Sequence, residues 1–218
     1  MKQVFITGGT GYMGKRLIRR LIKRGHTVTA LVRKGSENKV PAGVEVMIAN
    51  PFDAESFQSE ILKGSVFIQL LGVSHPSPNK AKQFKEIDLR SVKASVDAAS
   101  SAAVNHFIYV SVATTDSNLM KEYKAVREEC EAYCKEKELN CTFIRPWYVI
   151  GPGHWWPILL LPFYGIGELI PSMRNKFRSM ALVTINQMLD TLVTAVESEP
   201  VKERTVEIKE IRKASRNK

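Results

Sequence analysis

Glycine is concentrated near the start of the chain, where Gly8, Gly9, Gly11 and Gly14 fall within seven positions. They follow an apolar run and precede a stretch with helical periodicity, and from Gly9 they fit the spacing G-x-G-x-x-G. In that context one glycine permits a tight turn, a second lets the backbone approach a pyrophosphate, and a third lets helix and strand pack closely. The amides at the start of the helix then face the anion. The pattern predicts a dinucleotide site formed by Gly8, Thr10, Gly11, Tyr12, Met13 and Gly14.

The residues after the second predicted strand indicate which dinucleotide binds. An NAD site usually places Asp or Glu about 20 residues after the glycines, where the carboxylate holds the ribose hydroxyls. Here the strand TVTALV ends in Arg33 and Lys34, and the first carboxylate after it is Glu37. A guanidinium suits the 2′-phosphate of NADP, because it can bind a phosphate through two parallel hydrogen bonds. We therefore expect NADP(H) rather than NAD(H); the alternative is that both cations are solvated loop charges.

Two histidines, His75 and His154, follow predicted strands. An imidazole is a ready acid or base near neutral pH, and ligands of open α/β sheets bind outside the carboxyl ends of the strands. Both histidines are therefore candidates for the substrate side of the site, and the alternative is that each is an ordinary loop residue. His26 and His106 stand at strand starts, which is the wrong end of the sheet.

The elements that must position these residues alternate between strand and helix along the chain. The predicted strands are Val4–Thr7, Thr27–Val32, Val44–Ile48, Val66–Leu71, Phe107–Ser111, Thr142–Arg145 and Thr205–Ile208. The predicted helices are Lys15–Arg24, Ala54–Leu62, Asn79–Ala103, Leu119–Glu138 and Asn186–Glu197. This alternation is typical of a parallel sheet covered on both faces. It predicts an α/β fold with a Rossmann-like, doubly wound parallel sheet, in one domain over 1–218 whose residues 151–185 form a small substrate-side region.

The composition is that of a globular protein with a basic surface. Hydrophobic residues make up 44% and charged residues 25%, which is close to average. The net charge of +10 is compatible with nucleic acid or anionic membrane as a partner, but a polyanionic cofactor is the simpler interpretation, and no nucleic acid is expected. Three cysteines without zinc-type spacing, and no recognisable signal peptide, indicate a cytoplasmic protein without a metal site. No run reaches the about 20 apolar residues of a membrane-spanning helix.

Several stretches resemble the short-chain dehydrogenase/reductase superfamily, in particular its atypical, NAD(P)H-binding and epimerase-like branch. TGGTGYMG at Thr7–Gly14 matches that family's TGxxGxxG, and IRPWYVIGPG at Ile144–Gly153 resembles its RPxxVxGPG loop near the nicotinamide. IANPFDAESF at Ile48–Phe57 and FIQLLG at Phe67–Gly72 resemble two further cofactor-side stretches. The resemblance covers essentially the whole chain. It implies further cofactor contacts at Asn50, which replaces the family's usual Asp beside the adenine, and at Pro51, Leu71, Gly72, Pro146, Tyr148 and Val149.

The same resemblance implies a catalytic set. The family uses Ser at the end of the fifth strand and Tyr-x-x-x-Lys on the next helix; Ser111 and Tyr123 match the first two, and Arg127 occupies the lysine position. A tyrosine with a pKa of about 10 is a poor base at neutral pH, and a cation one helical turn away lowers that pKa. Arg127 supplies the charge and can bond a ribose, but it lacks the compact ammonium and proton exchange of lysine. Tyr123 is expected to transfer a proton less efficiently, or to be an exposed tyrosine on a polar helix.

Aromatic residues gather after the sixth predicted strand. Trp147, Trp155 and Trp156 fall within ten residues and are followed by PILLLPFY. In the family this region closes over the substrate, so Trp147 and Trp155 are expected to face a small apolar or aromatic substrate. The alternatives are an ordinary covering helix, or a surface for a membrane or partner protein in which the cations of 174–178 meet lipid phosphates.

Two classes of function stay open. The first is an NADP(H)-dependent oxidoreductase that moves hydride to or from a carbonyl, alcohol or quinone-like apolar substrate. Ser111 would then orient the oxygen, Tyr123 would transfer the proton, and Arg127 would hold the ribose and tune the tyrosine. The second is a non-catalytic NADP(H)-binding sensor or assembly protein, which the arginine at the lysine position favours. A sugar-nucleotide epimerase or dehydratase is less favoured, because few polar groups stand near the predicted pocket. The sequence indicates neither the identity of the substrate nor an oligomeric state.

Overall fold

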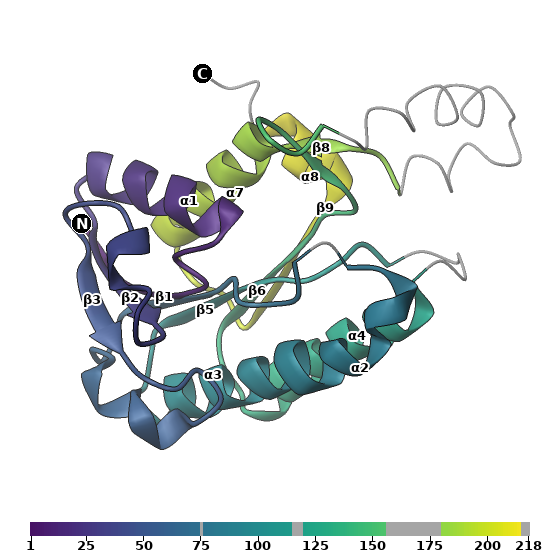
Figure 1. Ribbon diagram of the computed structural model, residues 1–218. Coiled ribbons are helices and arrows are strands. Elements are labelled where there is room, and N and C mark those ends of the chain that lie inside the picture. Colours follow the sequence, from purple (N-terminus) through teal and green to yellow (C-terminus); the bar gives the residue numbers. More distant parts are fainter. Residues whose placement is uncertain (75, 115–119, 156–179, 215–218) are drawn as a thin grey trace, which may run out of the picture.

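The computed structural model of the chain describes residues 1–74, 76–114, 120–155 and 180–214 (Figure 1). A seven-stranded sheet lies at its centre, in the order β3-β2-β1-β4-β5-β6-β9, and every neighbouring pair in it is parallel. The strands are β1 (Gln3–Thr7), β2 (Thr27–Val32), β3 (Glu45–Ile48), β4 (Val66–Gln69), β5 (His106–Val110), β6 (Cys141–Arg145) and β9 (Glu203–Glu207). Strand order reverses between β1 and β4, which is where open sheets of this kind bind their ligands.

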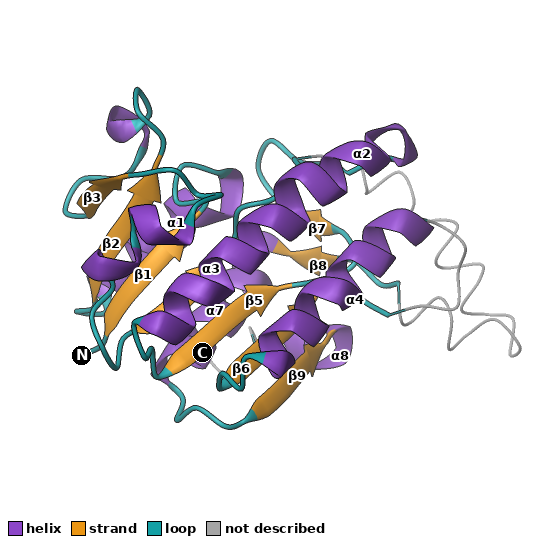
Figure 2. Ribbon diagram, turned by 90° about the horizontal axis from the view of Figure 1, so that it is seen from below, coloured by secondary structure: helices purple, strands orange, loops and turns teal. Residues whose placement is uncertain are grey.

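Helices cover both faces of the sheet, so the predicted doubly wound, Rossmann-like fold is confirmed. One face carries α1 (Tyr12–Lys23), α7 (Ile185–Glu197) and α8 (Ile208–Lys213), as Figure 1 shows. The other carries α2 (Ala81–Gln83), α3 (Arg90–Ser101) and α4 (Lys121–Glu136); Figure 2 shows α3 and α4 lying along the strands. A small separate sheet joins β7 (Val149–Ile150) to β8 (Val183–Thr184) in parallel.

The period of two along each strand divides the buried side chains between two cores. Val4 and Ile6 pack with the aliphatic residues of α1 and α7, whereas Phe5 between them packs on the α3–α4 side. On that second side Phe67 lies between Phe5 and Phe107, with ring centroids 5.2 Å from each. Aliphatic packing thus holds α1 and α7, and a row of aromatic rings crosses three neighbouring strands beneath α3 and α4.

The predicted helix Ala54–Leu62 is wrong. This segment forms two single-turn 3₁₀ helices instead, Ala54–Ser56 and Gln58–Glu60. The Asp53 side chain accepts from the Glu55 amide, and the Ser56 hydroxyl donates to the Asp53 carbonyl at 2.7 Å. Such local bonds from short polar side chains compete with helical backbone bonds.

The predicted helix Asn79–Ala103 exists as a composite. It begins with a 3₁₀ turn, Pro78–Lys80, passes through α2 and a π-helical stretch, Phe84–Leu89, and ends as α3. π-Helical segments are rare and often lie at functional sites. Beyond the last predicted strand the sequence analysis missed α8, which begins with a reciprocal capping interaction between Glu207 and Glu210. Within the described ranges, no helix is long and apolar enough to cross a membrane.

Candidate active site

The glycine turn between β1 and α1 is held by close backbone contacts. Gly8 has φ +71°, and a Cβ there would lie 2.7 Å from the backbone of Leu70 and Leu71, at the end of β4. A Cβ on Gly14 would collide with the Gly8 carbonyl oxygen. Gly11 differs: among the described residues a Cβ there would meet only that carbonyl oxygen, at 3.1 Å. Two glycines therefore build the turn, and the third keeps open space in front of the helix.

The start of α1 is arranged to receive an anion. Gly11 is the N-cap and offers no side chain to the first helical amides, which have no carbonyl partner within a helix. The first turn contains no acidic residue. Both features leave the positive end of the helix dipole available to a negatively charged group.

A cleft of about 360 Å³ opens beside this turn. Seven predicted cofactor residues line it: Gly8, Thr10, Gly11, Arg33, Pro51, Leu71 and Gly72. The other predicted contacts do not line it: Tyr12, Met13 and Gly14 in the first turn of α1, Lys34 and Asn50, and Pro146, Tyr148 and Val149 after β6. The Asn50 side chain instead accepts from the Phe52 amide at 3.1 Å, so it closes a local turn.

The charge of the cleft is basic at the end of β2. Arg33 is exposed and lines the cleft, and Lys80 lines it from the far wall. No Asp or Glu stands among the described residues that line the cleft. Glu37, the first carboxylate after β2, accepts from the Gly35 amide at 2.9 Å. A hydrogen bond from its own amide, and then the one from Gly35, lower the pKa of Glu37.

Sequence reasoning missed several residues of the cleft wall: Ser36, Phe52, Val73, Ser74, Lys80 and Gln83. Of these residues, Phe52 has the clearest signal in the sequence. It directly follows Pro51 in the segment Ile48–Phe57, which resembles a cofactor-side stretch of the family. Its ring lies 5.4 Å from the Arg90 guanidinium carbon, so it presents an aromatic surface backed by a cation. Phe52 and Pro51 give the cleft an apolar end.

Arg127 is the centre of a buried polar cluster beyond the Gly72 end of the cleft. Its guanidinium donates to the Asp88 carboxylate at 2.5 Å, to the Tyr109 hydroxyl at 2.9 Å and to the Val110 carbonyl at 3.0 Å. The guanidinium carbon also lies 4.8 Å from the centre of the Tyr123 ring. Arg127 therefore contacts the predicted tyrosine, while most of its donors are already bonded within the protein.

Asp88 is the main residue that sequence reasoning missed. It lies in the π-helical stretch, is fully buried, and accepts from the Val73 amide at 3.0 Å as well as from Arg127. Burial raises the pKa of Asp88, although Arg127 and the Val73 amide oppose that shift. A Cβ on Gly72 would lie 2.8 Å from the Asp88 carboxylate and 2.9 Å from the guanidinium. Because glycine has no side chain, the Asp88–Arg127 ion pair adjoins the cleft at Gly72.

Tyr123 is partly buried on α4, and its ring meets the Phe84 ring edge-on at 4.9 Å. Burial raises the pKa of Tyr123, and the opposing effect of the Arg127 guanidinium does not reverse that shift. Its phenol therefore stays protonated at neutral pH. A phenol that is protonated at rest can act as a proton donor, and its raised pKa makes it a weaker acid than a free tyrosine.

Ser111 directly follows Val110, whose carbonyl Arg127 holds. It is 4% exposed, and its hydroxyl has no hydrogen-bond partner in the described part of the chain. A buried hydroxyl without a hydrogen-bond partner costs free energy of folding. We therefore expect the Ser111 hydroxyl to have a functional role. It can bond the oxygen of a bound molecule.

The loop after β6 reaches back to α1. The His154 ring centroid lies 5.8 Å from that of Tyr12, and a Cβ on Gly151 would lie 2.5 Å from the Tyr12 hydroxyl. Trp147 is partly buried and meets the Tyr148 ring edge-on, whereas Trp155 is 54% exposed. His154 therefore lies by the glycine turn. His75, Trp156, the cations of 174–178 and most of the predicted substrate-side region 151–185 lie outside the described residues.

The chain is similar to several known proteins. The sequence profile of the family described as NAD(P)H-binding matches residues 8–151. The NADH-ubiquinone oxidoreductase 40 kDa subunit of Neurospora crassa mitochondria is 23% identical over 196 residues, which are 86% of this chain and 51% of that protein. Ceramide reductase of Caulobacter vibrioides is 23% identical over 192 residues, 87% of this chain and 59% of that protein. This chain thus spans between half and two thirds of the length of these relatives.

Among solved structures, UDP-glucuronic acid 4-epimerase of Bacillus cereus in complex with NAD superposes with a TM-score of 0.67. It is 13% identical, and the match covers 94% of this chain and 77% of that one. At this identity the likeness shows the fold alone.

Proposed function

This chain belongs to the NAD(P)H-binding family, and on that premise we propose that it is an NADP(H)-dependent oxidoreductase of the atypical short-chain dehydrogenase/reductase type. Its substrate is an apolar molecule with a carbonyl, which it reduces to an alcohol, or a quinone. When bound, the nicotinamide cofactor supplies or accepts the hydride. The protein binds and orients both molecules and moves the proton.

The cleft supports NADP(H) over NAD(H). The amides at the start of α1 and the open space at Gly11 would hold the pyrophosphate. Arg33 stands at the end of β2, where its guanidinium would pair with a 2′-phosphate. A carboxylate that would hold the ribose hydroxyls of NAD is missing from the described lining of the cleft.

The observation that carries the enzymatic proposal is the position of Arg127 between Tyr123 and Val110, the residue before Ser111. The guanidinium contacts the Tyr123 ring and donates to the Val110 carbonyl, so one group links the tyrosine to the backbone just before the serine. The Ser111 hydroxyl would bond the substrate oxygen, and the neutral Tyr123 phenol would donate a proton to it. In the direction of reduction the phenol starts protonated, which is its state at neutral pH.

An apolar substrate is supported by the residues around the loop after β6. Trp147 and the exposed Trp155 present large aromatic surfaces there. One relative is named a ceramide reductase. The three cysteines are free and buried, which fits a reducing compartment, and we place the reaction in the cytoplasm.

The competing proposal is a non-catalytic NADP(H)-binding sensor or assembly protein. Arg127 favours it, because Asp88, Tyr109 and Val110 occupy donors that the family's lysine position would offer to a ribose. Another relative is a subunit of NADH-ubiquinone oxidoreductase. Both proposals expect NADP(H) to bind, but only the first expects the protein to oxidise or reduce a substrate.

A screen of NADPH consumption with aldehydes, ketones and quinones separates them. We expect turnover with at least one apolar carbonyl compound or quinone, and tighter binding of NADPH than of NADH by calorimetry. Tight NADPH binding without turnover on any member of the panel would contradict the enzymatic proposal and support the sensor. Equal or tighter binding of NADH would contradict the assignment of the cofactor.

A further inference from the structure

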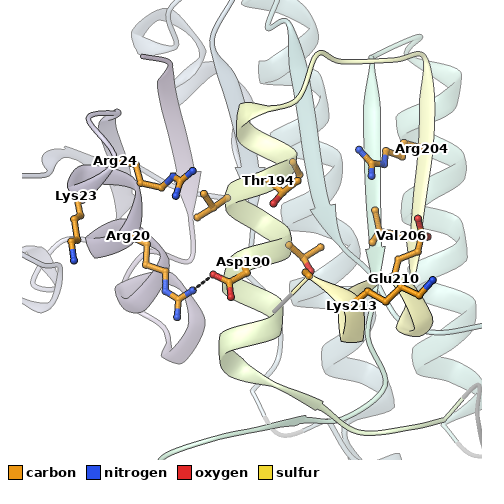
Figure 3. A pocket seen from close by; sticks show the side chains of 13 residues that line it. Arg20, Lys23, Arg24, Asp190, Thr194, Arg204, Val206, Glu210 and Lys213 are labelled. Atoms are coloured by element: carbon orange, nitrogen blue, oxygen red, sulfur yellow. Dashed lines mark hydrogen bonds and ion pairs between the residues drawn. The ribbon is translucent and has the colours of Figure 1, made fainter. Parts of the chain in front are cut away.

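A second hollow lies on the α1–α7 face of the molecule, away from the cofactor cleft. This basic groove has a volume of about 770 Å³ and is bounded by α1 on one side of α7 and by β9 and α8 on the other (Figure 3). It shares no lining residue with the cleft. Val193 and Ala195 of α7 and Val206 of β9 give its floor an apolar character.

Two of the cations around the basic groove are used inside the fold. Arg20 of α1 pairs with Asp190 and donates to the Asn186 side chain at 2.7 Å, which joins α1 to α7. Arg24 binds both carboxylate oxygens of Glu197, at 2.5 and 2.8 Å. These pairs hold the wall of the groove in place.

Three further cations line the groove without such a role. Lys23, Arg204 and Lys213 are exposed, and none of them has an ion pair or hydrogen bond from its side chain within the described part of the chain. Glu210, an acidic residue of the same lining, accepts from the Glu207 amide at 3.2 Å and caps α8. The groove therefore has a surplus of positive charge that the fold does not use.

We propose that the basic groove binds an acidic peptide segment of a partner protein. Lys23 stands on one side of α7, and Arg204 and Lys213 stand on the other (Figure 3), so an occupant that meets all three must be extended. A single phosphate is too small for that. The apolar floor requires apolar side chains between the acidic ones, facing Val193 and Val206.

Two other occupants fit less well. A second copy of this chain also carries a net charge of +10, so the two surfaces repel in general. An anionic membrane is a broad surface and would contact the rim cations without filling the hollow between them. An acidic segment matches both the charge and the shape, and its binding would leave the cofactor cleft free.

The proposal is tested by panning a random dodecapeptide display library on the full chain. The selected peptides are then titrated by fluorescence anisotropy against two triple variants. One is Lys23→Gln/Arg204→Gln/Lys213→Gln. The control, Lys39→Gln/Lys63→Gln/Lys85→Gln, removes the same charge from exposed lysines outside the groove. Melting temperature confirms that each variant is folded, and photo-crosslinking on the unmodified chain locates the peptide independently.

We expect selected peptides with acidic residues at both ends and apolar residues between, crosslinked to α7 or β9. The groove variant should bind them about tenfold more weakly, which is the scale of three exposed ion pairs, while the control changes affinity less than about twofold. NADPH affinity should be unchanged in both variants. Three results would overturn the proposal: selection of peptides without acidic residues, equal loss in the control variant, or groove-dependent binding to phosphatidylserine vesicles with none to peptides.

Discussion

Replacing Arg127 by methionine should destabilise the protein strongly, because it leaves a charge buried without its partner. Asp88 is fully buried, and Arg127 is its one ion-pair partner among the described residues. The change also removes the donor of the Tyr109 hydroxyl and of the Val110 carbonyl. Methionine fills much of the same space, so packing changes little.

The magnitude follows from the burial of the pair. Breaking a buried ion pair by removing one partner typically costs about 3–5 kcal/mol of the free energy of unfolding. The double variant Asp88→Asn/Arg127→Met should recover most of this loss, since asparagine carries no charge and can still accept from the Val73 amide. As a matched control, Arg19→Met removes an exposed arginine of α1 and should change stability by less than about 0.5 kcal/mol.

The loss should also depend on pH. Burial already raises the pKa of Asp88, and removal of Arg127 takes away the main opposing influence, so the pKa rises further. A carboxyl whose pKa is higher in the folded state holds its proton more tightly there. Proton binding by Asp88 therefore stabilises the folded state fully below the pKa of the unfolded state, about 3.9. This stabilisation is lost as the pH rises towards the pKa of the folded state. Arg127→Met should lose more stability relative to the parent at pH 8 than at pH 5, and the double variant should not.

Urea denaturation of the four proteins at both pH values measures these free energies. A loss below about 1 kcal/mol in Arg127→Met, or an equal loss at both pH values, would refute the reasoning. In that case Arg127 would not be a structural partner of Asp88, and its guanidinium would be available to a bound ribose.

Three further predictions concern the cofactor cleft and α7. Gly11→Val should leave the fold intact but abolish NADPH binding by calorimetry, because the new side chain enters the open space before α1, whereas Gly14→Ala should fail to fold by circular dichroism, because its Cβ meets the Gly8 carbonyl. Arg33→Asp should weaken NADPH binding about tenfold and spare NADH, the scale of one charge-assisted hydrogen bond. Thr184→Ala removes the side-chain cap that accepts from the Gln187 amide and should lower the free energy of unfolding by about 1 kcal/mol in urea.

Local spacing predicted the parts of the site that depend on local structure. The glycine turn needs only a strand, a helix, close contacts at Gly8 and Gly14 and open space at Gly11, so the spacing of the glycines predicts it directly. The same holds for the basic end of β2 at Arg33. Local reasoning failed over Ala54–Leu62, where Asp53 and Ser56 form side-chain bonds to the backbone that outweigh a modest helical pattern.

The parts that could not be predicted depend on contacts across the chain. Asp88 binds Arg127, which lies 39 positions later in the sequence. Asp88 lies in a π-helical stretch, which the periodicity of the sequence does not predict. The sequence shows the arginine at the family's lysine position, but it does not show that Asp88, Tyr109 and Val110 bind its guanidinium. The basic groove likewise combines Lys23 with Arg204 and Lys213, which only the packing of α1, β9 and α8 around α7 brings to one surface.

The central claim is that Tyr123 supplies the proton of an NADPH-dependent reduction. Its most direct test compares the unmodified chain with Tyr123→Phe, using the best substrate of the screen, with NADPH affinity measured in parallel. The account predicts that kcat falls about a hundredfold or more, or about 3 kcal/mol of transition-state stabilisation, while the Kd for NADPH changes less than about twofold. Undiminished kcat in a folded Tyr123→Phe that binds NADPH normally would contradict it.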